Sequence, residues 1–462
     1  MDREAVIWTS IGDAPMKMGR LNVTDEECRF NYDPAYLETN LPGMGVLHNP
    51  ELIGRNPLVW KRTEYFPVFP ELKSLIPPDN EQNFQRKLIL AYLAKIDVAP
   101  AIGFETDWEI LMVAGHGGIG HNDVFKDDET AKKWYEDSEP APFYKMDESF
   151  GFSLKEFLSW MDNDADMIIN AIGPTPSVGG AVPKLLLSIP STGWDCRIAL
   201  PTKKTTNDRT DVILKFEQTN QYPGIIDLEA LALDIHKEAG FEVPRYWKTS
   251  INGIKAIAIE RFDRNEFNKP VFMETVLSVM ASGDKTITNN HSSSYDRIAD
   301  AIDKITVPFV HDPVKAKEYV FKRLILSFLT GNGDLHLENM SIIELQGERF
   351  FSPVYDPTPM RAYKIHDMLS PMPFGNYGEF ATNDEDMVDF DEALLRLLKK
   401  YSISKPRGRA IVEASLEVTN DYLQRVNALQ SVTDDSKKIL ETAVVFVRKK
   451  LQKFLVTPSS SS

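Results

Sequence analysis

Cysteine is scarce in this sequence, with only two cysteines, Cys28 and Cys196, among 462 residues. Two cysteines that lie far apart in a chain of this length do not build a disulfide framework, so a reducing, cytoplasmic compartment is expected. The first stretch, MDREAVIWTSIGDAPMKMG, lacks the basic start and apolar core of a signal peptide. No apolar run reaches the roughly 20 residues of a membrane span, so no membrane partner is expected.

Positive charge is also in short supply. The 52 Lys and Arg residues are outnumbered by 68 Asp and Glu residues, which gives a formal net charge of -16. Nucleic-acid backbones are held by clustered Lys and Arg, so this balance argues against a wide nucleic-acid contact by the chain itself. A basic protein partner and a locally basic cleft remain compatible with it.

Several signatures of hydrolases and metal sites are missing as well. The sequence has no His-x-x-x-His helix, no closely spaced Cys pair and no Gly-x-Ser-x-Gly elbow. The stretch GHGGIGHNDVF, residues 115–125, carries two histidines, but its glycines favour a tight turn over a metal site. What remains is 42% hydrophobic and 26% charged, typical of a globular protein with two or three domains at this length.

The patterning of the chain changes from strand-like to helical. Between about residues 166 and 264, short apolar segments bounded by turn residues predict strands at 184–190, 196–202, 211–217 and 254–262. One helix is expected among them over 227–240, starting at Asp227 as N-cap and ending at Gly240. Later, apolar residues at helical spacing predict helices at 315–331, 389–401, 409–429 and 435–455.

The first 150 residues are mixed in character. Segment 83–96 has helical spacing, and the acidic stretch 126–142 predicts an exposed helix followed by a linker. The last residues, TPSSSS, cannot bury a side chain of any size and are expected to be disordered. The whole pattern predicts an α+β fold, with a small β-rich lobe, a larger helical lobe and an additional N-terminal unit.

The stretch LTGNGDLHLENMSI, residues 329–342, gathers Asp334, His336 and Asn339. Two strand-like pieces follow and would form a hairpin that returns Asp356 beside Asn339. A carboxylate and an amide oxygen suit a Mg²⁺ ion that bridges nucleotide phosphates. Asp334 would then orient an attacking hydroxyl or accept its proton, with His336 bracing the loop. A polar surface turn is the alternative, and the position of Asp356 favours a site.

Lys215 interrupts the otherwise apolar strand segment VILKFE. Such a lysine commonly points to solvent, but in a β-lobe it could reach nucleotide phosphates as a point charge. Glu229, near the start of the following helix, is placed to pair with it. The alternative for Glu229 is an acidic residue that complements the helix dipole.

Two further segments could contact a nucleotide. The loop SVGGAVPK, residues 177–184, could cover phosphates with the backbone amides of Ser177, Val178, Gly179 and Gly180, although a hairpin turn explains a Gly-Gly pair equally well. The charged segment IERFDR, residues 259–264, could be a hinge whose backbone meets an adenine edge, or simply a solvated strand end.

These pieces, in this order, resemble the HipA family of serine/threonine kinase toxins from bacterial toxin–antitoxin pairs. SVGGAVPK, VILKF, LEALALDIHKEAGFEVP, AIERFDR, GNGDLHLEN and SPVYDPT are similar to the family's loop, lysine strand, glutamate helix, hinge, catalytic loop and metal-binding aspartate. In the N-terminal third, MGRLNV, FNYDPAYLE, FPELKSLIPPD and GGIGHNDVF are similar to the family's N-terminal unit. The resemblance therefore covers most of the chain.

The resemblance implies a bilobal protein-kinase-like fold that uses ATP and Mg²⁺. Lys215 would contact the ATP phosphates, braced by Glu229, and the backbones of Glu260 and Phe262 would hold the adenine. Asp334 would be the catalytic aspartate, while Asn339 and Asp356 would ligate Mg²⁺. Ser177 matches the family's autophosphorylation site, whose modification ejects the loop, and Thr175 is a neighbouring candidate hydroxyl.

The family also implies partners and domain boundaries. The expected partner is a small helix-turn-helix antitoxin of the HipB type, through which DNA would be met only indirectly, and the expected target is a translation component such as an aminoacyl-tRNA synthetase. The expected parts are an N-terminal subdomain over 1–150, a kinase N-lobe over 151–264, a helical C-lobe over 265–456 and a tail over 457–462. A small-molecule phosphotransferase of the aminoglycoside or choline kinase type and a non-catalytic kinase-like binding protein are the alternatives.

Overall fold

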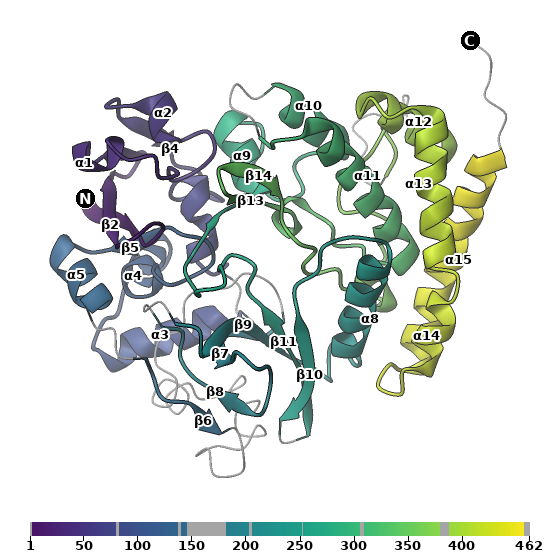
Figure 1. The fold of residues 1–462 in the computed structure, drawn as a ribbon, viewed down its shortest axis with the longest axis horizontal. Helices are drawn as coiled ribbons and strands as arrows, with labels where there is room; N and C mark the ends of the chain where they lie inside the picture. The colour runs from purple at the N-terminus through teal and green to yellow at the C-terminus, as the bar shows by residue number, and fades with distance from the viewer. Residues whose placement is uncertain are drawn as a thin grey trace. The chain divides into compact units, whose positions relative to one another are not determined.

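The chain folds into two compact units. The computed structural model describes residues 2–79, 83–136, 140–145, 182–202, 206–251, 253–304, 309–378 and 388–456. Unit 1 combines Met1–Glu217 with Arg245–Glu274, and unit 2 combines Gln218–Pro244 with Thr275–Ser462. Unit 1 thus includes both the N-terminal third and the central strands, whereas the helix between those strands belongs to unit 2 (Figure 1). The three-part division expected from the sequence stays a prediction.

Unit 1 begins with a five-stranded sheet in the order β4-β3-β2-β1-β5, in which each described pairing is antiparallel. Short helices and a pair of longer ones accompany it, and the longer helix α3 confirms the helix expected over 83–96. The bounds are β1 Arg3–Thr9, β2 Met16–Val23, β3 Glu27–Tyr32, α1 Pro34–Leu37, α2 Pro50–Ile53, β4 Leu58–Lys61, η1 Pro70–Leu75, α3 Phe84–Lys95, α4 Phe104–Ala114, β5 Asp123–Phe125 and α5 Asp128–Glu136.

A second sheet in unit 1 has the order β10-β11-β9-β7 and is also antiparallel. The expected strands at 184–190, 211–217 and 254–262 are confirmed by β7, β9 and β11, but the segment 196–202 forms only the two-residue β8. The strands of this sheet are β7 Lys184–Pro190, β9 Arg209–Phe216, β10 Tyr246–Ile251 and β11 Ile254–Glu260. Outside it lie β6 Tyr144–Lys145 and β8 Arg197–Ile198, which pair with each other, and β12 Phe272–Thr275.

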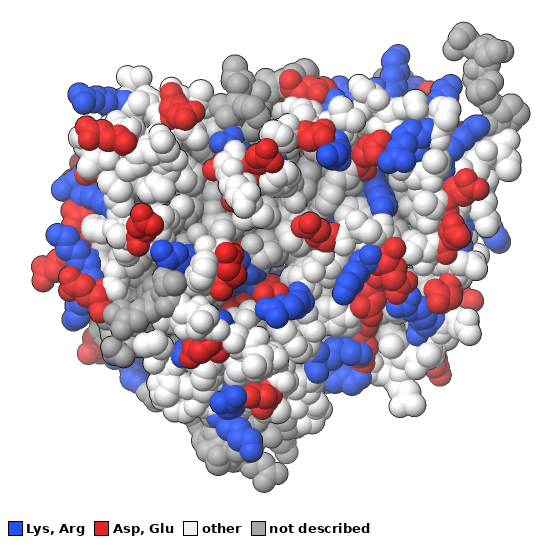
Figure 2. Space-filling view, in the orientation of Figure 1, with Lys and Arg blue, Asp and Glu red and all other residues white. Residues whose placement is uncertain are grey.

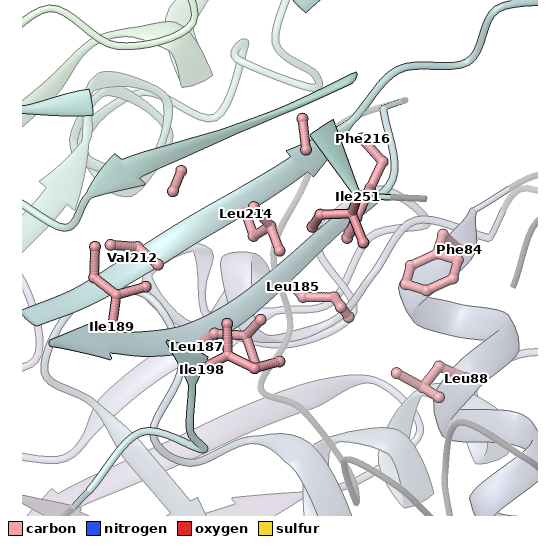
Figure 3. Close-up of a cluster of buried hydrophobic side chains, with 12 residues drawn as sticks. Phe84, Leu88, Leu185, Leu187, Ile189, Ile198, Val212, Leu214, Phe216 and Ile251 are labelled. Atoms are coloured by element: carbon pink, nitrogen blue, oxygen red, sulfur yellow. The ribbon is translucent and has the colours of Figure 1, made fainter. Parts of the chain in front are cut away.

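A shared hydrophobic core joins helix α3 to this second sheet (Figure 3). Phe84 and Leu88 from α3 pack with Leu185, Leu214 and other apolar side chains of the strands. Burying such side chains contributes about 1.5–3 kcal/mol each relative to leaving them in water. Helix α3 of the N-terminal third and the central strands therefore share one hydrophobic core.

Unit 2 is mainly helical and contains one short hairpin. Its helices α11, α12 and α15 match the expected helices at 315–331, 389–401 and 435–455. The segment 409–429 was predicted as one helix, which is wrong, because the helix stops at Val418 and α14 starts at Tyr422. The bounds are α8 Ile225–Glu238, α9 Val276–Gly283, α10 Tyr295–Lys304, α11 Pro313–Thr330, η2 Leu337–Asn339, β13 Ser341–Leu345, β14 Glu348–Phe351, η3 Met360–Ala362, α12 Phe390–Lys400, α13 Lys405–Val418, α14 Tyr422–Ala428 and α15 Asp434–Val456.

Helix α8 starts earlier than the sequence suggested. Its N-cap is Gly224 in a left-handed conformation, and Asp227 lies in its first turn, so the expectation of Asp227 as N-cap is wrong. The Asp227 carboxylate instead accepts a hydrogen bond from Ser431 at 2.6 Å. The expected C-terminal end is confirmed, since Gly240 follows the helix with a φ of 81°.

A buried arginine and histidine pair ties α8 to α11. Arg323, only 1% exposed, donates from Nη1 to Nε2 of His236 at 2.6 Å. The other ring nitrogen, Nδ1, lies 2.7 Å from the Ala232 carbonyl, so it carries the proton. Burial, with the nearby Arg323 charge, holds the pKa of His236 well below its ordinary value. The imidazole therefore stays neutral and acts as an acceptor for the arginine.

Charged side chains are interspersed over the face of the molecule drawn in Figure 2, where basic and acidic groups alternate without forming one wide patch. Among the described residues, no helix is both long and apolar enough to cross a membrane.

Candidate functional site

Helix α11 delivers the polar loop that the sequence singled out. Asp312 caps the helix start by accepting from the amides of Val314 and Lys315, and Pro313 occupies the first turn. The helix ends at Gly331, whose φ of 73° is a left-handed conformation that glycine adopts without strain. The chain then turns sharply, so that the loop starts from a helix whose second half is buried.

The loop closes on itself around Asp334. Asn332 is 1% exposed, and its Oδ1 accepts from the Asp334 amide at 2.9 Å. The side chain of Asn339 donates from Nδ2 to the Asp334 carbonyl at 2.6 Å. That bond fixes the orientation of the amide and leaves Oδ1 of Asn339, the atom that a divalent cation would bind, outside it. The Asp334 side chain is itself 43% exposed and so is accessible from solvent.

His336 caps the short turn η2 rather than standing apart from the loop. Its Nδ1 accepts from the Glu338 amide at 3.2 Å, so the proton lies on Nε2. Nε2 faces Oδ1 of Asp334 at 3.6 Å, too long for a hydrogen bond but close enough for electrostatic attraction. The ring also packs edge-on against His291. This arrangement suits the bracing role expected for His336, and a catalytic role stays a prediction.

The expected hairpin after the loop is confirmed and brings Asp356 back. Strands β13 and β14 pair antiparallel, with Ile342 opposite Phe351. Beyond the hairpin, the hydroxyl of Tyr355 donates to the Glu338 carbonyl at 2.5 Å. Asp356 therefore follows a residue that is bonded to the loop. Asp356 has a φ of 49°, a left-handed conformation that is unusual outside glycine and is common at functional sites.

Two tyrosines donate hydrogen bonds to carbonyl groups of the loop, and the sequence reasoning missed both. Tyr295, fully buried at the start of α10, donates to the Leu335 carbonyl at 2.6 Å. Tyr355 bonds the Glu338 carbonyl and also shares a 2.7 Å hydrogen bond with Ser341. Only Tyr355 had a signal in the sequence, because it directly precedes Asp356.

Lys215 lies in unit 1, on strand β9, and is buried rather than solvent-facing. It is 4% exposed and is directly opposite Lys184 across the β7–β9 pairing. Lys184 is also buried, at 6% exposed. Directly opposed residues share one face of a sheet, so two lysines come from the same face. The sequence reasoning did not identify Lys184 as a site residue.

Glu229 lies in unit 2, on helix α8, one turn beyond the helix start. It is 1% exposed, so it is not a solvated residue that merely complements the helix dipole. Its pairing with Lys215 stays a prediction, because the two side chains belong to different units.

The backbone of the expected hinge continues strand β11. The Glu260 amide donates to the Arg245 carbonyl, and the Arg261 amide donates to the Asp211 carbonyl on strand β9, both at 2.9 Å. Strand β11 ends at Glu260, and Phe262 and Asp263 lie in a turn. The resemblance assigns the backbones of Glu260 and Phe262 to the adenine, and that assignment stays a prediction. The Glu260 side chain forms an ion pair with Arg245 at 2.7 Å.

The glycine-bearing loop lies outside the described residues. The expectations for Thr175, Ser177, Val178, Gly179 and Gly180 therefore stay predictions. The tail over 457–462 lies outside as well.

The histidines of segment 115–125 have structural contacts in unit 1. His121, 2% exposed, lies with Nε2 at 2.9 Å from the Gly43 carbonyl, and burial lowers the pKa of its imidazole to about 4. His116 lies with Nδ1 at 3.2 Å from the Val124 carbonyl and stacks on Phe125. Both contacts agree with the expected turn.

The donor set for a cation is small but of the right chemistry. Asn339 and Asp356 offer oxygen atoms, and Asp356 Oδ1 also lies 3.5 Å from the Thr358 hydroxyl. Within the described ranges no three His, Cys, Asp or Glu side chains gather into a metal cage. Magnesium commonly uses one or two protein ligands and completes its shell with water and substrate phosphates. These residues therefore fit Mg²⁺ better than a structural metal.

Comparison with known proteins gives the family. Residues 176–422, more than half of the chain, match the family described as HipA-like C-terminal domain. The chain belongs to this family. The match includes the loop, the strands of the second sheet, helix α8, the Asp334 loop and Asp356, so the resemblance noted in the sequence is confirmed.

A protein of known sequence extends the comparison. A Haemophilus influenzae protein named "Putative kinase" is 29% identical over 243 residues, which cover 47% of this chain and 66% of that protein. The HipA-like chain therefore spans about two thirds of that relative.

A solved structure of the HipA toxin of Shewanella oneidensis MR-1, in complex with HipB and its operator DNA, matches with a TM-score of 0.61. The match covers 98% of this chain and 97% of that chain at 14% identity. A likeness at that identity establishes the fold, so the expected α+β, kinase-like fold is confirmed for this HipA-like protein.

Proposed function

We propose that this protein is an ATP- and Mg²⁺-dependent serine/threonine protein kinase, the toxin of a toxin–antitoxin pair. The observation that carries the proposal is the closed loop around Asp334 and Asn339, with Asp356 held next to it through Tyr355. Family membership supports it, since the matched region includes every residue assigned to the reaction except Thr175.

The reaction transfers the terminal phosphoryl group of ATP to a serine or threonine hydroxyl. The bond between that phosphorus and the bridging oxygen breaks, a new phosphorus–oxygen bond forms, and ADP leaves. Asp334 orients the hydroxyl and accepts its proton. Lys215, braced by Glu229, holds phosphate oxygens as a point charge, and the backbones of Glu260 and Phe262 hold the adenine.

Mg²⁺ would be held by Asn339 and Asp356 and would neutralise charge on the phosphates. The amides of the loop from Ser177 to Gly180 would cover the phosphates. Ser177, with Thr175 as its neighbour, would be the hydroxyl modified by the kinase itself, and His336 would keep Asp334 oriented.

The proposed partners follow from the relatives. The Shewanella HipA structure contains HipB and operator DNA. We propose a small helix-turn-helix antitoxin of that type for this protein, with DNA met through the antitoxin. The net charge of -16 suits a basic partner. The proposed target is a protein of translation, with an aminoacyl-tRNA synthetase as the class to test first, and the proposed compartment is the cytoplasm.

The first prediction concerns Asp334→Asn in the full chain incubated with Mg-ATP. Removing the proton acceptor is expected to lower phosphate transfer by about 10²–10⁴-fold, because general-base assistance contributes that much. Phosphate on the protein is measured by intact-mass spectrometry with time, and nucleotide binding by calorimetry. The matched control is Asp421→Asn, an aspartate with a side chain 58% exposed at the start of helix α14 in unit 2.

Two outcomes would contradict the proposal. If wild-type protein gains no phosphate on itself or on a protein acceptor, the chain is a non-catalytic binding protein. If it phosphorylates aminoglycosides or choline-like alcohols faster than proteins, it is a small-molecule kinase. Persistence of full transfer in Asp334→Asn would remove Asp334 from its role while leaving the enzyme class open to another base.

A further inference from the structure

Two sequence segments meet in unit 1, and the proposed reaction uses only the backbone of one of them. One is the glycine-rich turn of residues 117–123, and the other is segment 259–264, IERFDR. Arg261, in the middle of the expected hinge, is 2% exposed and sends its guanidinium into the turn. Its Nη2 donates to the Gly118 carbonyl at 2.5 Å, and Nη1 lies 3.5 Å from the Gly117 carbonyl.

Asp263 joins the hinge to the same turn as a hydrogen-bond acceptor. Its carboxylate accepts from Arg261 at 2.9 and 2.7 Å, and it accepts from the Gly120 amide at 2.8 Å. Arg264 also bonds Asp263 at 3.0 Å and donates to the Gly118 and Gly120 carbonyls. The hinge and the turn are thus joined by charge-assisted hydrogen bonds in both directions, which are stronger than neutral ones.

Burial makes this junction stiff. Burial alone would raise the pKa of Asp263, but the charges of Arg261 and Arg264 and the hydrogen bonds outweigh it, so the pKa lies below its ordinary value. The carboxylate therefore stays charged at neutral pH. Few alternative arrangements can satisfy two buried guanidinium groups, so the backbone that carries them has little freedom.

The turn is itself anchored to the N-terminal sheet. Asp123, the first residue of β5, accepts from the Gly117 amide at 2.6 Å and from the Tyr135 hydroxyl at 2.5 Å. Strand β5 pairs with β1, where Trp8 is opposite Asp123. The chain of contacts therefore runs from the N-terminal sheet through the turn to the middle residue of the hinge.

We propose that the N-terminal sheet positions the nucleobase-binding backbone through Arg261 and Asp263. Arg261 and Asp263 anchor this segment through their side chains, while the backbones of their neighbours Glu260 and Phe262 meet the purine. Arg261 and Asp263 are positioning residues, because their buried side chains are bonded to the turn. This inference rests on the proposed kinase function and adds that the N-terminal sheet sets purine selectivity.

The test compares ATP and GTP binding by full-length variants. Arg261→Met keeps roughly the length of the side chain but removes the guanidinium group and its hydrogen-bond donors. It is expected to weaken Mg-ATP binding about tenfold, equivalent to one hydrogen bond, while Mg-GTP binding changes less than about twofold. Both dissociation constants are measured by calorimetry. The dissociation constant for GTP divided by that for ATP is therefore expected to fall towards one. In turnover, KM for ATP rises and kcat at saturating ATP is retained.

The matched control is Arg86→Met. Arg86 is a similarly buried arginine of unit 1, 4% exposed, that bonds the Pro77 carbonyl at 3.0 Å and Asp107 at 2.7 Å, away from the hinge. Arg86→Met should lower thermal stability without changing the ratio of the GTP dissociation constant to the ATP dissociation constant. If Arg261→Met does not fold, Asp263→Asn, which keeps volume and removes only the charge, is measured instead and is expected to lower the ratio in the same direction.

The outcomes separate this inference from the proposed function. If wild-type protein binds neither nucleotide, both fall. If wild-type protein prefers ATP and the hinge variants keep the same preference as Arg86→Met, only the positioning role is overturned.

Discussion

At the scale of single residues, one hydroxyl connects the two acidic parts of the candidate site. Tyr355 is covalently next to Asp356 and bonds the Glu338 carbonyl, which lies beside Asn339 in the loop. Burial is the main cause that raises the pKa of Tyr355 above its ordinary value, so the phenol keeps its proton at neutral pH. The distance between the two proposed magnesium ligands thus depends on this hydrogen bond.

Tyr355→Phe should therefore impair catalysis more than folding. Loss of the hydroxyl leaves the Glu338 carbonyl without that donor and is expected to cost about 1–3 kcal/mol of stability. The small displacement of Asp356 relative to Asn339 should lower kcat about tenfold or more and raise the Mg²⁺ concentration needed for half-maximal activity. Activity is measured as a function of Mg²⁺ concentration, with stability from urea unfolding.

Tyr319→Phe is the matched control for this change. Tyr319 is a half-buried tyrosine of the same unit, but its hydroxyl donates to the Ser352 carbonyl at 3.1 Å, at the end of the hairpin and not in the loop. It should lose similar stability without a shift in the Mg²⁺ requirement. Equal shifts in both variants would refute the positioning role of Tyr355.

At the scale of secondary-structure elements, the end of α11 determines where the loop begins. The Gly331 amide donates to the Ser327 carbonyl and completes the helix cap. A Cβ on Gly331 would lie 2.3 Å from Cδ1 of Leu440, on helix α15. Glycine is therefore required twice here, by its positive φ and by the close approach of another helix.

Gly331→Ala is expected to lower the free energy of unfolding by about 2–5 kcal/mol, the combined cost of a left-handed non-glycine residue and of overpacking. Gly240→Ala is the control, because Gly240 also ends a helix with a φ of 81° but a Cβ there meets only Nζ of Lys322, at 4.0 Å. It should cost about 1–2 kcal/mol. Denaturant unfolding of both variants measures the difference. Equal costs would mean that α15 shifts freely to admit the methyl group.

The elements themselves were largely predictable, and the exceptions have local causes. Apolar spacing located α3, α11, α12 and α15 correctly. It could not show that the helix over 409–429 breaks, because apolar residues keep their helical spacing on both sides of the polar residues 419–421. In the structure the Thr419 hydroxyl bonds the Ser415 carbonyl, and the Asn420 amide bonds the Glu417 carbonyl, which ends one helix before the next starts.

At the scale of the whole molecule, the N-terminal third is part of the unit that contains the central sheet. Phe84 and Leu88 cover that sheet, and the turn 117–123 surrounds the buried charges of Arg261 and Asp263. A separable N-terminal domain would leave those groups without cover. The boundary expected near residue 150 stays a prediction, and the N-terminal third lies in the same compact unit as the strands that follow.

A chain that starts at residue 127 should therefore fail to fold cooperatively. Leaving a buried charge without its partners costs about 3–5 kcal/mol, and total stability is typically only about 5–15 kcal/mol before the lost apolar contacts are included. Soluble yield and thermal unfolding by circular dichroism measure this. A chain that ends at Val456 is the control and should unfold like the full-length protein. A sharp, unshifted transition in the shortened chain would show that the N-terminal third is independent.

The sequence by itself indicated the family of this protein and the candidate residues of its site. Lys215 was identifiable because it interrupts an apolar strand. The polar residues Asp334, His336 and Asn339 gather in one loop, and the expected hairpin returned Asp356 to it. The order of these motifs resembled one family. Those signals are local, since each depends on a few neighbouring residues.

Tertiary structure alone decided what supports these groups. Tyr295 and Tyr355 bond carbonyl groups of the Asp334 loop. Arg261 and Asp263 bond a turn that is remote from them in the chain. A tyrosine or an arginine in a sequence carries no sign of which carbonyl it will meet. Burial converted ordinary polar side chains into fixed anchors, because a buried donor must find an acceptor wherever the fold provides one.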